Sequence, residues 1–309
     1  MIIMIIIRNL FHALFILFAV STITFGLLYV SGDPVLLLLP PDALPEEIKA
    51  LRETMGLNDP LHIQYIRFLG KLVRCDLGHS FFYKESALKL LLERTPATLE
   101  LACAAMIFAM VIAIPLGILS AVKYGTGLDN LSLGLATIGQ AVPIFWLGLM
   151  LMLVFSVSLG WLPTSGRGNW NHLILPASSL GAYPMAAIVR LLRANLLTAL
   201  RMDYITVARA KGIREFWVVT KHALKNAAIP VVTLIGLQLG TMLGGTIVVE
   251  TIFAWPGIGR LTIFAIYHRD FPLVQASVIY LAAVFVILNL ITDLTYRFLD
   301  PRVRVGRAL

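Results

Sequence analysis

One long basic segment lies near the middle of this otherwise apolar sequence, Met202 to Pro230. From Arg190 to Ala228 the chain carries eight Lys and Arg residues against two acidic ones. Apolar residues alternate with the basic ones at helical spacing, and Gly212 interrupts the run. The pattern predicts two short amphipathic helices joined by a bend at the glycine. A segment of this kind is typical of a surface that binds a partner rather than of a catalytic site. The partner is either a protein surface or anionic lipid.

Residues that could bind a metal ion or act as nucleophiles are scattered along the chain. Cys75 lies in a polar stretch and Cys103 in an apolar one, so neither a disulfide between them nor a cysteine metal site is predicted. The sequence has no G-x-x-x-x-G-K-[ST] phosphate loop, so we do not expect the chain to bind ATP in that way. The histidines show no metal-ligand spacing. They are His12, His62, His79, His172, His222 and His268.

The composition places the elements that carry these residues in a lipid bilayer. Of the 309 residues, 59% are hydrophobic and only 14% are charged, and the mean hydropathy is +0.86. Soluble domains average about 45 to 50% apolar and about 25% charged residues. Because roughly 20 apolar residues cross a hydrocarbon core, we predict an all-α polytopic membrane protein with six transmembrane helices. The six apolar runs are 9–30, 98–121, 131–158, 177–196, 230–253 and 274–297.

The charges of the connecting loops predict the orientation of these helices. The middle loop, 197–229, and the C-terminal tail are rich in Lys and Arg, whereas the short loops on the other side hold few. By the positive-inside rule, the middle loop and both termini face the cytoplasm. The segment 31–97 is then extracytoplasmic, although so long a loop carries little weight in the rule. We expect one membrane domain, 1–309, because the other connections are too short to fold alone.

The long external loop is predicted to contain two amphipathic helices. One begins at Pro45, which two acidic residues follow, and ends at Gly56. The other lies in DPLHIQYIRFLGKLVRCDLG, where apolar residues recur at helical intervals between basic ones. These helices form either a packing cap on the membrane helices or a docking surface for a soluble partner.

Few polar groups lie within the predicted membrane helices. Because their burial in lipid is costly, such groups mark either a path through the bilayer or hydrogen bonds between helices. Asp293 is expected to pair with Arg297 one turn later. Glu250 is expected near the outer interface. Both readings stay open for the remaining three, which are Gln140, Gln238 and Asn289.

Short motifs along nearly the whole chain occur in the order found in one family of membrane proteins. They are GDP, GLNDPLHIQY, DLGHS, RTPATLEL, GWLPTSG, DYITVARAKG, HALKNAAIPVVT, ETIFAWPGIGR, HRDFPLVQ and LDPRVR. In these motifs the chain resembles the permease subunits of ABC importers for dipeptides, oligopeptides, nickel and glutathione, in particular the first of their two permeases. The middle segment also resembles the EAA signature of importer permeases, with Thr206, Val207 and Ala208 in place of an acidic-Ala-Ala triplet.

The resemblance implies a type I importer permease fold and a bacterial inner-membrane location. It implies three kinds of protein partner: a homologous second permease, two cytoplasmic ATPases and an extracytoplasmic binding protein that delivers di- or oligopeptides. ATP and magnesium are then bound by the ATPases, and this chain holds no cofactor, metal or nucleic acid.

The resemblance also assigns roles to residues. The family inserts a coupling helix into a groove of the ATPase, and the matching residues here are Asp203, Tyr204, Thr206, Ala208, Arg209, Ala210, Lys211 and Gly212. An outer gate or a contact with the binding protein is expected at Asp33, Glu250, Trp255, Pro256 and Gly257.

Other readings of the chain remain. The same machine could import nickel or glutathione. An ion-coupled secondary carrier or channel should show inverted repeats, broken helices or a midplane carboxylate, and the sequence shows none of these convincingly. A membrane-tethered nucleic-acid binder is prompted by the basic segment. The apolar residues between the basic ones favour protein docking instead.

Overall fold

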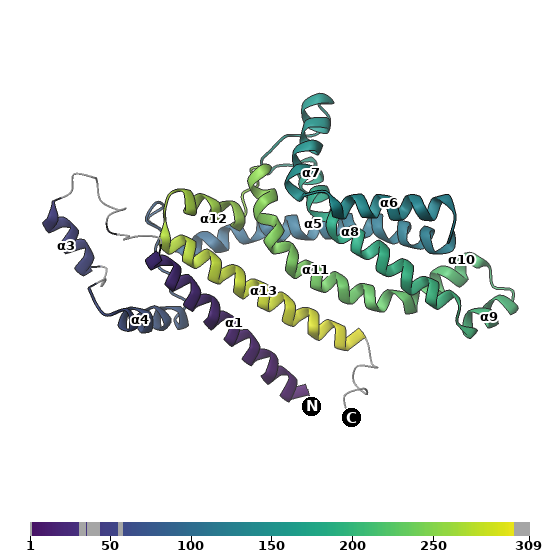
Figure 1. Ribbon diagram of the computed structural model, residues 1–309, viewed down its shortest axis with the longest axis horizontal. Helices are drawn as coiled ribbons and strands as arrows, with labels where there is room; N and C mark the ends of the chain where they lie inside the picture. The colour runs from purple at the N-terminus through teal and green to yellow at the C-terminus, as the bar shows by residue number, and fades with distance from the viewer. Residues whose placement is uncertain (1, 31–34, 36–43, 55–57, 300–309) are drawn as a thin grey trace. The chain divides into compact units, whose positions relative to one another are not determined.

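The computed structural model describes residues 2–30, 35, 44–54 and 58–299, and the side chains of 11–26, 35, 44–50, 52–53 and 58–292. Every regular element in these residues is a helix, so the all-α prediction is confirmed (Figure 1). In chain order they are α1 (Ile2–Val30), α3 (Pro45–Thr54), α4 (Leu61–Val73), α5 (Ala87–Val122), α6 (Gly127–Ala141), α7 (Ile144–Leu151), the π-helical η1 (Met152–Ser158), α8 (Asn171–Leu200), α9 (Asp203–Ala210), α10 (Glu215–Trp217), the π-helical η2 (Val218–Ala223), α11 (Leu224–Ile252), α12 (Ile258–Tyr267) and α13 (Phe271–Leu299).

Four helices of the described chain are apolar and long enough to cross a membrane, and there are five candidates if α6 with α7 and η1, a pair bent by 106°, forms one span. α1 contains the first apolar run, 9–30, and Phe11–Gly26, the part of α1 whose side chains are described, is an apolar stretch shorter than a full span. The number six therefore stays a prediction. The four unbroken stretches are Ala87–Val122, Asn171–Leu200, Glu215–Ile252 and Phe271–Thr292.

α5 begins eleven residues before the apolar run that predicted it, 98–121, so its first turns lie within the segment 31–97 that was predicted as the external loop. The first turns of α5 are amphipathic, and Lys89 lies 3.0 Å from the carboxylate of Glu85 and 4.0 Å from that of Glu93. Such pairs, four residues apart, stabilise a helix in water. Hydropathy does not predict a helix of this kind, because the helix contains no long apolar run.

By its internal contacts the chain divides into two compact units, and the first comprises residues 1–96 and 257–286. In this unit α4 packs on α1, where Thr22 Oγ1 and Tyr65 Oη form a 2.6 Å hydrogen bond and the rings of Phe25 and Phe68 stack at 5.7 Å. α3 and α4 confirm the two amphipathic helices, while the predicted end at Gly56 lies outside the described residues.

Asp270 connects two parts of the first unit that are far apart in the sequence. The Asp270 carboxylate accepts hydrogen bonds from Ser80 Oγ at 2.5 Å and from the backbone N–H groups of Phe81 and Phe82 at 3.1 Å. Asp270 and Ser80 are both buried, so these bonds satisfy polar groups that water does not reach. The start of α5 is thereby joined to the start of α13. The small apolar core beside them is Ala87, Leu90, Leu91, Ile258, Leu261, Ala265, Leu273 and Ala276.

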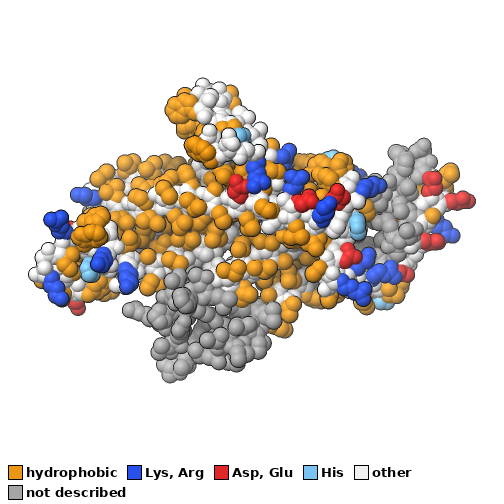
Figure 2. Space-filling view, turned by 180° about the vertical axis from the view of Figure 1, so that it is seen from behind, with side chains coloured by type: hydrophobic (Ala, Val, Ile, Leu, Met, Phe, Trp, Pro, Cys, Tyr) orange, Lys and Arg blue, Asp and Glu red, His pale blue; other side chains and the backbone are white. Residues whose placement is uncertain are grey.

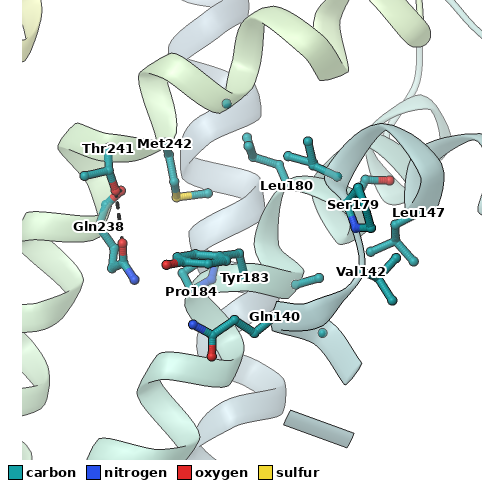
Figure 3. Close-up of a pocket in the computed structure, with 15 residues that line it drawn as sticks. Gln140, Val142, Leu147, Ser179, Leu180, Tyr183, Pro184, Gln238, Thr241 and Met242 are labelled. Carbon is teal, nitrogen blue, oxygen red and sulfur yellow. Dashed lines mark hydrogen bonds between the residues drawn. The ribbon is translucent and has the colours of Figure 1, made fainter. Parts of the chain in front are cut away.

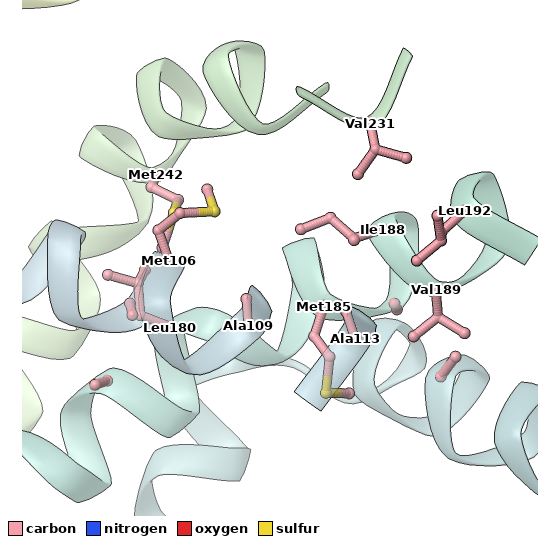
Figure 4. Close-up of a cluster of buried hydrophobic side chains, with 14 of the residues drawn as sticks. Met106, Ala109, Ala113, Leu180, Met185, Ile188, Val189, Leu192, Val231 and Met242 are labelled. Atoms are coloured by element: carbon pink, nitrogen blue, oxygen red, sulfur yellow. The ribbon is translucent and has the colours of Figure 1, made fainter. Parts of the chain in front are cut away.

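The second unit comprises residues 97–256 and 287–309 and contains the main core. Its centre is α8, which packs against α6, α7 and α11. Small and branched side chains of α5, α8 and α11 meet there (Figure 4), among them Ala109, Ile188 and Val231. The outer surfaces of the long helices remain hydrophobic (Figure 2). Lipid or a partner subunit must cover surfaces of this kind. The prediction of a single domain, 1–309, stays a prediction.

Candidate functional site

The basic segment forms one helix, a bend and the beginning of a second helix. α9 begins after Met202, whose backbone is extended (φ −78°, ψ 150°). Ile205 and Ala208, three residues apart on one face, are buried and belong to the main core. One side of α9 is thereby fixed to the second unit, and the other side is left exposed.

Gly212 makes the bend that the sequence predicted. Its φ of +73° lies in the left-handed region, which glycine enters without the steric cost that other residues meet. The Gly212 N–H donates to the Arg209 carbonyl at 2.9 Å, and the Ile213 N–H donates to the Ala208 carbonyl at 3.3 Å. This pair of bonds is a Schellman motif, which ends α9 and turns the chain toward α10.

The exposed side of the bend combines apolar and charged groups. The Arg209 guanidinium donates to the Glu215 carboxylate at 2.6 and 3.1 Å, which ties the two sides of the bend together. The hydrogen bond to Glu215 raises the pKa of Arg209 above its ordinary value. Of the predicted coupling residues only Ala208 is buried, and the others are exposed. The large apolar side chains exposed here are Met202, Tyr204, Val207, Phe216 and Trp217.

The second helix does not end where the sequence predicted. The sequence predicted a membrane helix over the apolar run 230–253, which begins at Pro230. Instead, α10 continues through the π-helical η2 into α11, and Pro230 lies inside a helix. η2 adds a wide turn at the point where basic residues give way to apolar ones. The bend at Gly212 is therefore connected directly to a membrane-spanning helix.

The third apolar run, 131–158, was predicted as one membrane helix, and the structure shows it broken into α6 and the helix formed by α7 and η1. α6 ends at Ala141 and α7 begins at Ile144, with a bend of 106° in the span. Pro143 has no backbone N–H and disfavours helical conformation at Val142, which is extended (φ −80°, ψ 126°). Hydropathy misses the break because both residues are apolar.

A cavity of about 360 Å³ lies beside this break, between α6, α7, α8 and α11. Most of its lining is apolar, and Figure 3 shows the ring of Tyr183 between Gln140 and the α11 side chains Gln238 and Met242. Gln238 accepts a 3.0 Å hydrogen bond from Thr241. The structure thus brings together two of the three polar residues predicted for a path. Asn289 is not among the residues that line this cavity.

The comparison with known families decides what kind of protein this is. Residues 113–305 match the family described as binding-protein-dependent transport system inner membrane component, and residues 1–102 match the N-terminal family of these membrane components. The chain belongs to this family. It is a permease subunit of a binding-protein-dependent ABC importer, and a multi-pass protein of the inner membrane.

Individual relatives cover nearly the whole permease. The dipeptide transport system permease protein DppB of Alkalihalophilus pseudofirmus is 40% identical, over 96% of this chain and 98% of its own. The glutathione transport system permease protein GsiC of Escherichia coli is 40% identical, over 93% of this chain and 94% of its own. The MetNI methionine ABC transporter, in inward-facing conformations, matches with a TM-score of 0.59 and 20% identity, over 68% of this chain and 96% of its own. At that identity the likeness shows the fold alone, which confirms the type I importer architecture.

Family membership decides against the secondary carrier and the nucleic-acid binder. The broken helix is one of the features that we expected of a carrier. The permease shows it nonetheless, so a broken span by itself does not separate the two classes. Among the described residues no group of three or more His, Cys, Asp and Glu side chains is placed to hold a metal ion.

Sequence reasoning missed the charged residues of α8. Arg190 and Arg193 were counted with the basic segment, although both fall within the predicted membrane run 177–196, and the structure places both inside α8. Arg193 donates to both carboxylate oxygens of Asp129 at 2.8 Å, and Asp129 also accepts bonds from Ser120 Oγ at 2.5 Å and the Gly125 N–H at 3.0 Å. The Arg193 side chain of the permease is 20% exposed and that of Asp129 3%. No local spacing pointed to this pair, because 64 positions separate its members.

The residues predicted for an outer gate are mostly buried. Glu250 accepts a 2.7 Å hydrogen bond from Thr98 Oγ1, and Trp255 Nε1 donates to the Ala97 carbonyl at 2.8 Å. Pro256 is half-buried and Gly257 is buried. Asp33 lies outside the described residues, as do the side chains of Asp293 and Arg297. Contact with a binding protein stays a prediction for these positions.

Proposed function

We propose that this chain pairs with a homologous permease to form the membrane pathway of an importer for short peptides. Two cytoplasmic ATPases, which bind ATP and magnesium, drive the pathway by gripping the α9–α10 bend, and an extracytoplasmic binding protein delivers the cargo. In this arrangement the segment 197–229 and both termini face the cytoplasm, and the 31–97 loop faces outward.

The observation that carries this proposal is the surface of the α9–α10 bend, which is fixed to the core on one side and exposes apolar side chains on the other. Ile205 and Ala208 anchor α9 in the main core, while Tyr204, Val207 and Trp217 are exposed. A monomer gains nothing from exposing such side chains at a charged site, whereas a docked partner would bury them. Because α9 follows α8 and α10 leads into α11, displacement of the bend acts on the two helices that contribute Tyr183 and Gln238 to the cavity.

The nature of the cargo rests on the relatives. The two permeases reported above are named for dipeptides and for glutathione, which is itself a modified peptide. The cavity, at about 360 Å³, falls in the range of small-ligand sites, roughly 300 to 1,000 Å³. Its apolar lining with a few amide and hydroxyl groups suits a peptide backbone carrying varied side chains.

The test of coupling uses vesicles that contain the whole importer. We expect Gly212→Pro to lower peptide uptake at least about tenfold while ATP hydrolysis continues, because proline holds φ near −65° and cannot form this bend. Gly212→Asn is the matched control, since asparagine tolerates left-handed backbone, and it should keep most of the uptake.

Charge reversal provides a second arm of the same test. The double substitution Arg209→Glu and Lys211→Glu should uncouple hydrolysis from uptake, whereas Lys123→Glu, in the loop between α5 and α6, should not. Normal uptake by both the Gly212→Pro and the double variant would refute the docking role.

Uptake of labelled dipeptide or of glutathione by the unaltered importer identifies the cargo, and transport of neither would refute the peptide proposal.

A further inference from the structure

Arg190 is a charged residue inside a membrane-spanning helix. It lies in α8, between four and five residues from the midpoint of Asn171–Leu200, which is about 7 Å along the helix axis. A guanidinium in a bilayer is costly unless it faces a partner or a water-filled space, and such residues commonly mark substrate pathways. Its surroundings should therefore show what offsets that cost.

The neighbouring Arg193 shows what a charge with a structural role looks like on the same helix. Its guanidinium is matched by the Asp129 carboxylate through two parallel hydrogen bonds. Arg190 has no such partner: within the described part of the chain no carboxylate lies within 4 Å of it, and its one side-chain hydrogen bond goes to the neutral Gln140 carbonyl. Guanidinium has five N–H donors, so most of its capacity for an anion is unused there.

Gln140 connects this cation to the cavity. Its side chain lines the cavity on the side of Tyr183 (Figure 3), and its Oε1 accepts the hydrogen bond from Arg190. Arg190 follows Tyr183 by seven residues, which places it on the same face of α8, two turns nearer the C-terminal end. The cation therefore lies just beyond the cavity, with one amide between them.

We infer that Arg190 and Gln140 form a subsite for a carboxylate of the transported molecule, such as the C-terminal carboxylate of a peptide. This inference rests on the proposed function and adds the group by which the cargo is recognised inside the permease. Guanidinium pairs with carboxylate through two parallel hydrogen bonds, which a neutral amide cannot match. The cargo carboxylate displaces the Gln140 amide from Arg190, and the return of the amide helps to release it.

The decisive variant is Gln140→Glu, which places a fixed carboxylate against Arg190. If the contact only holds α6 to α8, the stronger ion pair should leave transport unchanged or improve it. If Arg190 receives the cargo, the internal carboxylate should block it, and uptake of a free-acid dipeptide should fall at least about tenfold. Gln140→Ala is the matched comparison: it removes the amide without placing a carboxylate against Arg190, so it should lower uptake of the free acid less than Gln140→Glu does.

A matched pair of peptides isolates the carboxylate. Vesicles with the whole importer receive a dipeptide or its C-terminal amide, each at a concentration that saturates the binding protein. Gln140→Glu and Arg190→Gln should remove the preference for the free acid, whereas Arg190→Lys, which keeps the charge, should retain part of it. Uptake by the unaltered importer shows separately whether peptides are cargo at all.

The uptake of the two peptides by the variants distinguishes a carboxylate subsite from the other roles of this contact. Loss of free-acid uptake with little change for the amide supports the subsite. Unchanged or improved transport of both peptides in Gln140→Glu would show a contact that only holds α6 to α8, and equal loss of both peptides in Gln140→Glu and Arg190→Gln would show an effect that does not depend on the cargo carboxylate. Either result would overturn the inference. Failure of the unaltered importer to move either peptide, or glutathione, would instead refute the proposed function on which the subsite rests.

Discussion

At the scale of single residues, the permease treats two arginines on one helix differently because their neighbours differ. Arg193 meets a carboxylate that also accepts bonds from a hydroxyl and a backbone N–H, and its guanidinium lies 5.2 Å from the centre of the Tyr124 ring. These bonds occupy both carboxylate oxygens of Asp129 and two of the three Arg193 side-chain nitrogens, and such satisfaction of polar atoms is the condition under which a buried ion pair is tolerated. It anchors the start of α6 to α8.

Removing one member of this pair should destabilise the permease strongly. Asp129→Ala leaves the Arg193 side chain, which is only 20% exposed, without its counter-charge, and breaking a buried pair in this way typically costs about 3 to 5 kcal/mol. Thermal unfolding in detergent measures the loss. The control is Asp59→Ala, which breaks the exposed 2.7 Å pair with Arg67 and should cost under about 1 kcal/mol. Equal effects of the two substitutions would show that the buried pair contributes no more than the exposed one.

At the scale of elements, the packing of α8 depends on small residues. Gly181 lies where α8 approaches α5 so closely that an added Cβ would stand 2.5 Å from the Ala105 carbonyl oxygen. Backbone cannot move aside as a side chain can, so even one methyl group must separate the two helices. Contact of this kind replaces the hydrophobic effect as the source of helix association within lipid.

Gly181→Ala should therefore destabilise the helix bundle, by about 1 to 3 kcal/mol as for other overpacked cores. Gly244→Ala in α11 is the matched control, since its added Cβ would meet nothing within 4 Å, and alanine is the better helix former. Thermal unfolding of both variants in one detergent compares them. A Gly181→Ala variant as stable as Gly244→Ala would disprove the close contact.

At the scale of the whole molecule, the permease is one part of a machine. Hydrophobic side chains cover much of the surface in Figure 2, and the α9–α10 bend exposes further apolar groups among charges. The sequence has no phosphate loop to bind ATP. In the proposed importer, the energy for transport comes from the ATPase subunits that the permease contacts.

The purified permease in vesicles should release phosphate from ATP no faster than empty vesicles do. Adding the ATPase subunits should start hydrolysis, and adding the loaded binding protein should raise it. Phosphate release is measured at each step. Hydrolysis that rises with the amount of permease alone would contradict this division of labour.

Much of the architecture could be predicted from the sequence because lipid imposes a simple rule. A run of about 20 apolar residues has to form a helix in a bilayer, so the positions of α5, α8, α11 and α13 follow from hydropathy. The bend at Gly212 could also be predicted, because it depends on the backbone of one residue and its immediate neighbours. The start of α5 could not, because its first turns are stabilised by charges in water.

By itself, then, the sequence determined the helices, the amphipathic segment with its glycine bend and, through many motifs, the family. Only the tertiary structure decided which polar residues meet. It paired Asp129 with Arg193 across 64 positions, left Arg190 against Gln140 at the edge of a cavity, and placed Asn289 outside the lining of that cavity. The physical reason is that helix formation depends on neighbours along the chain, whereas compensation of a buried charge depends on whichever helix packs beside it.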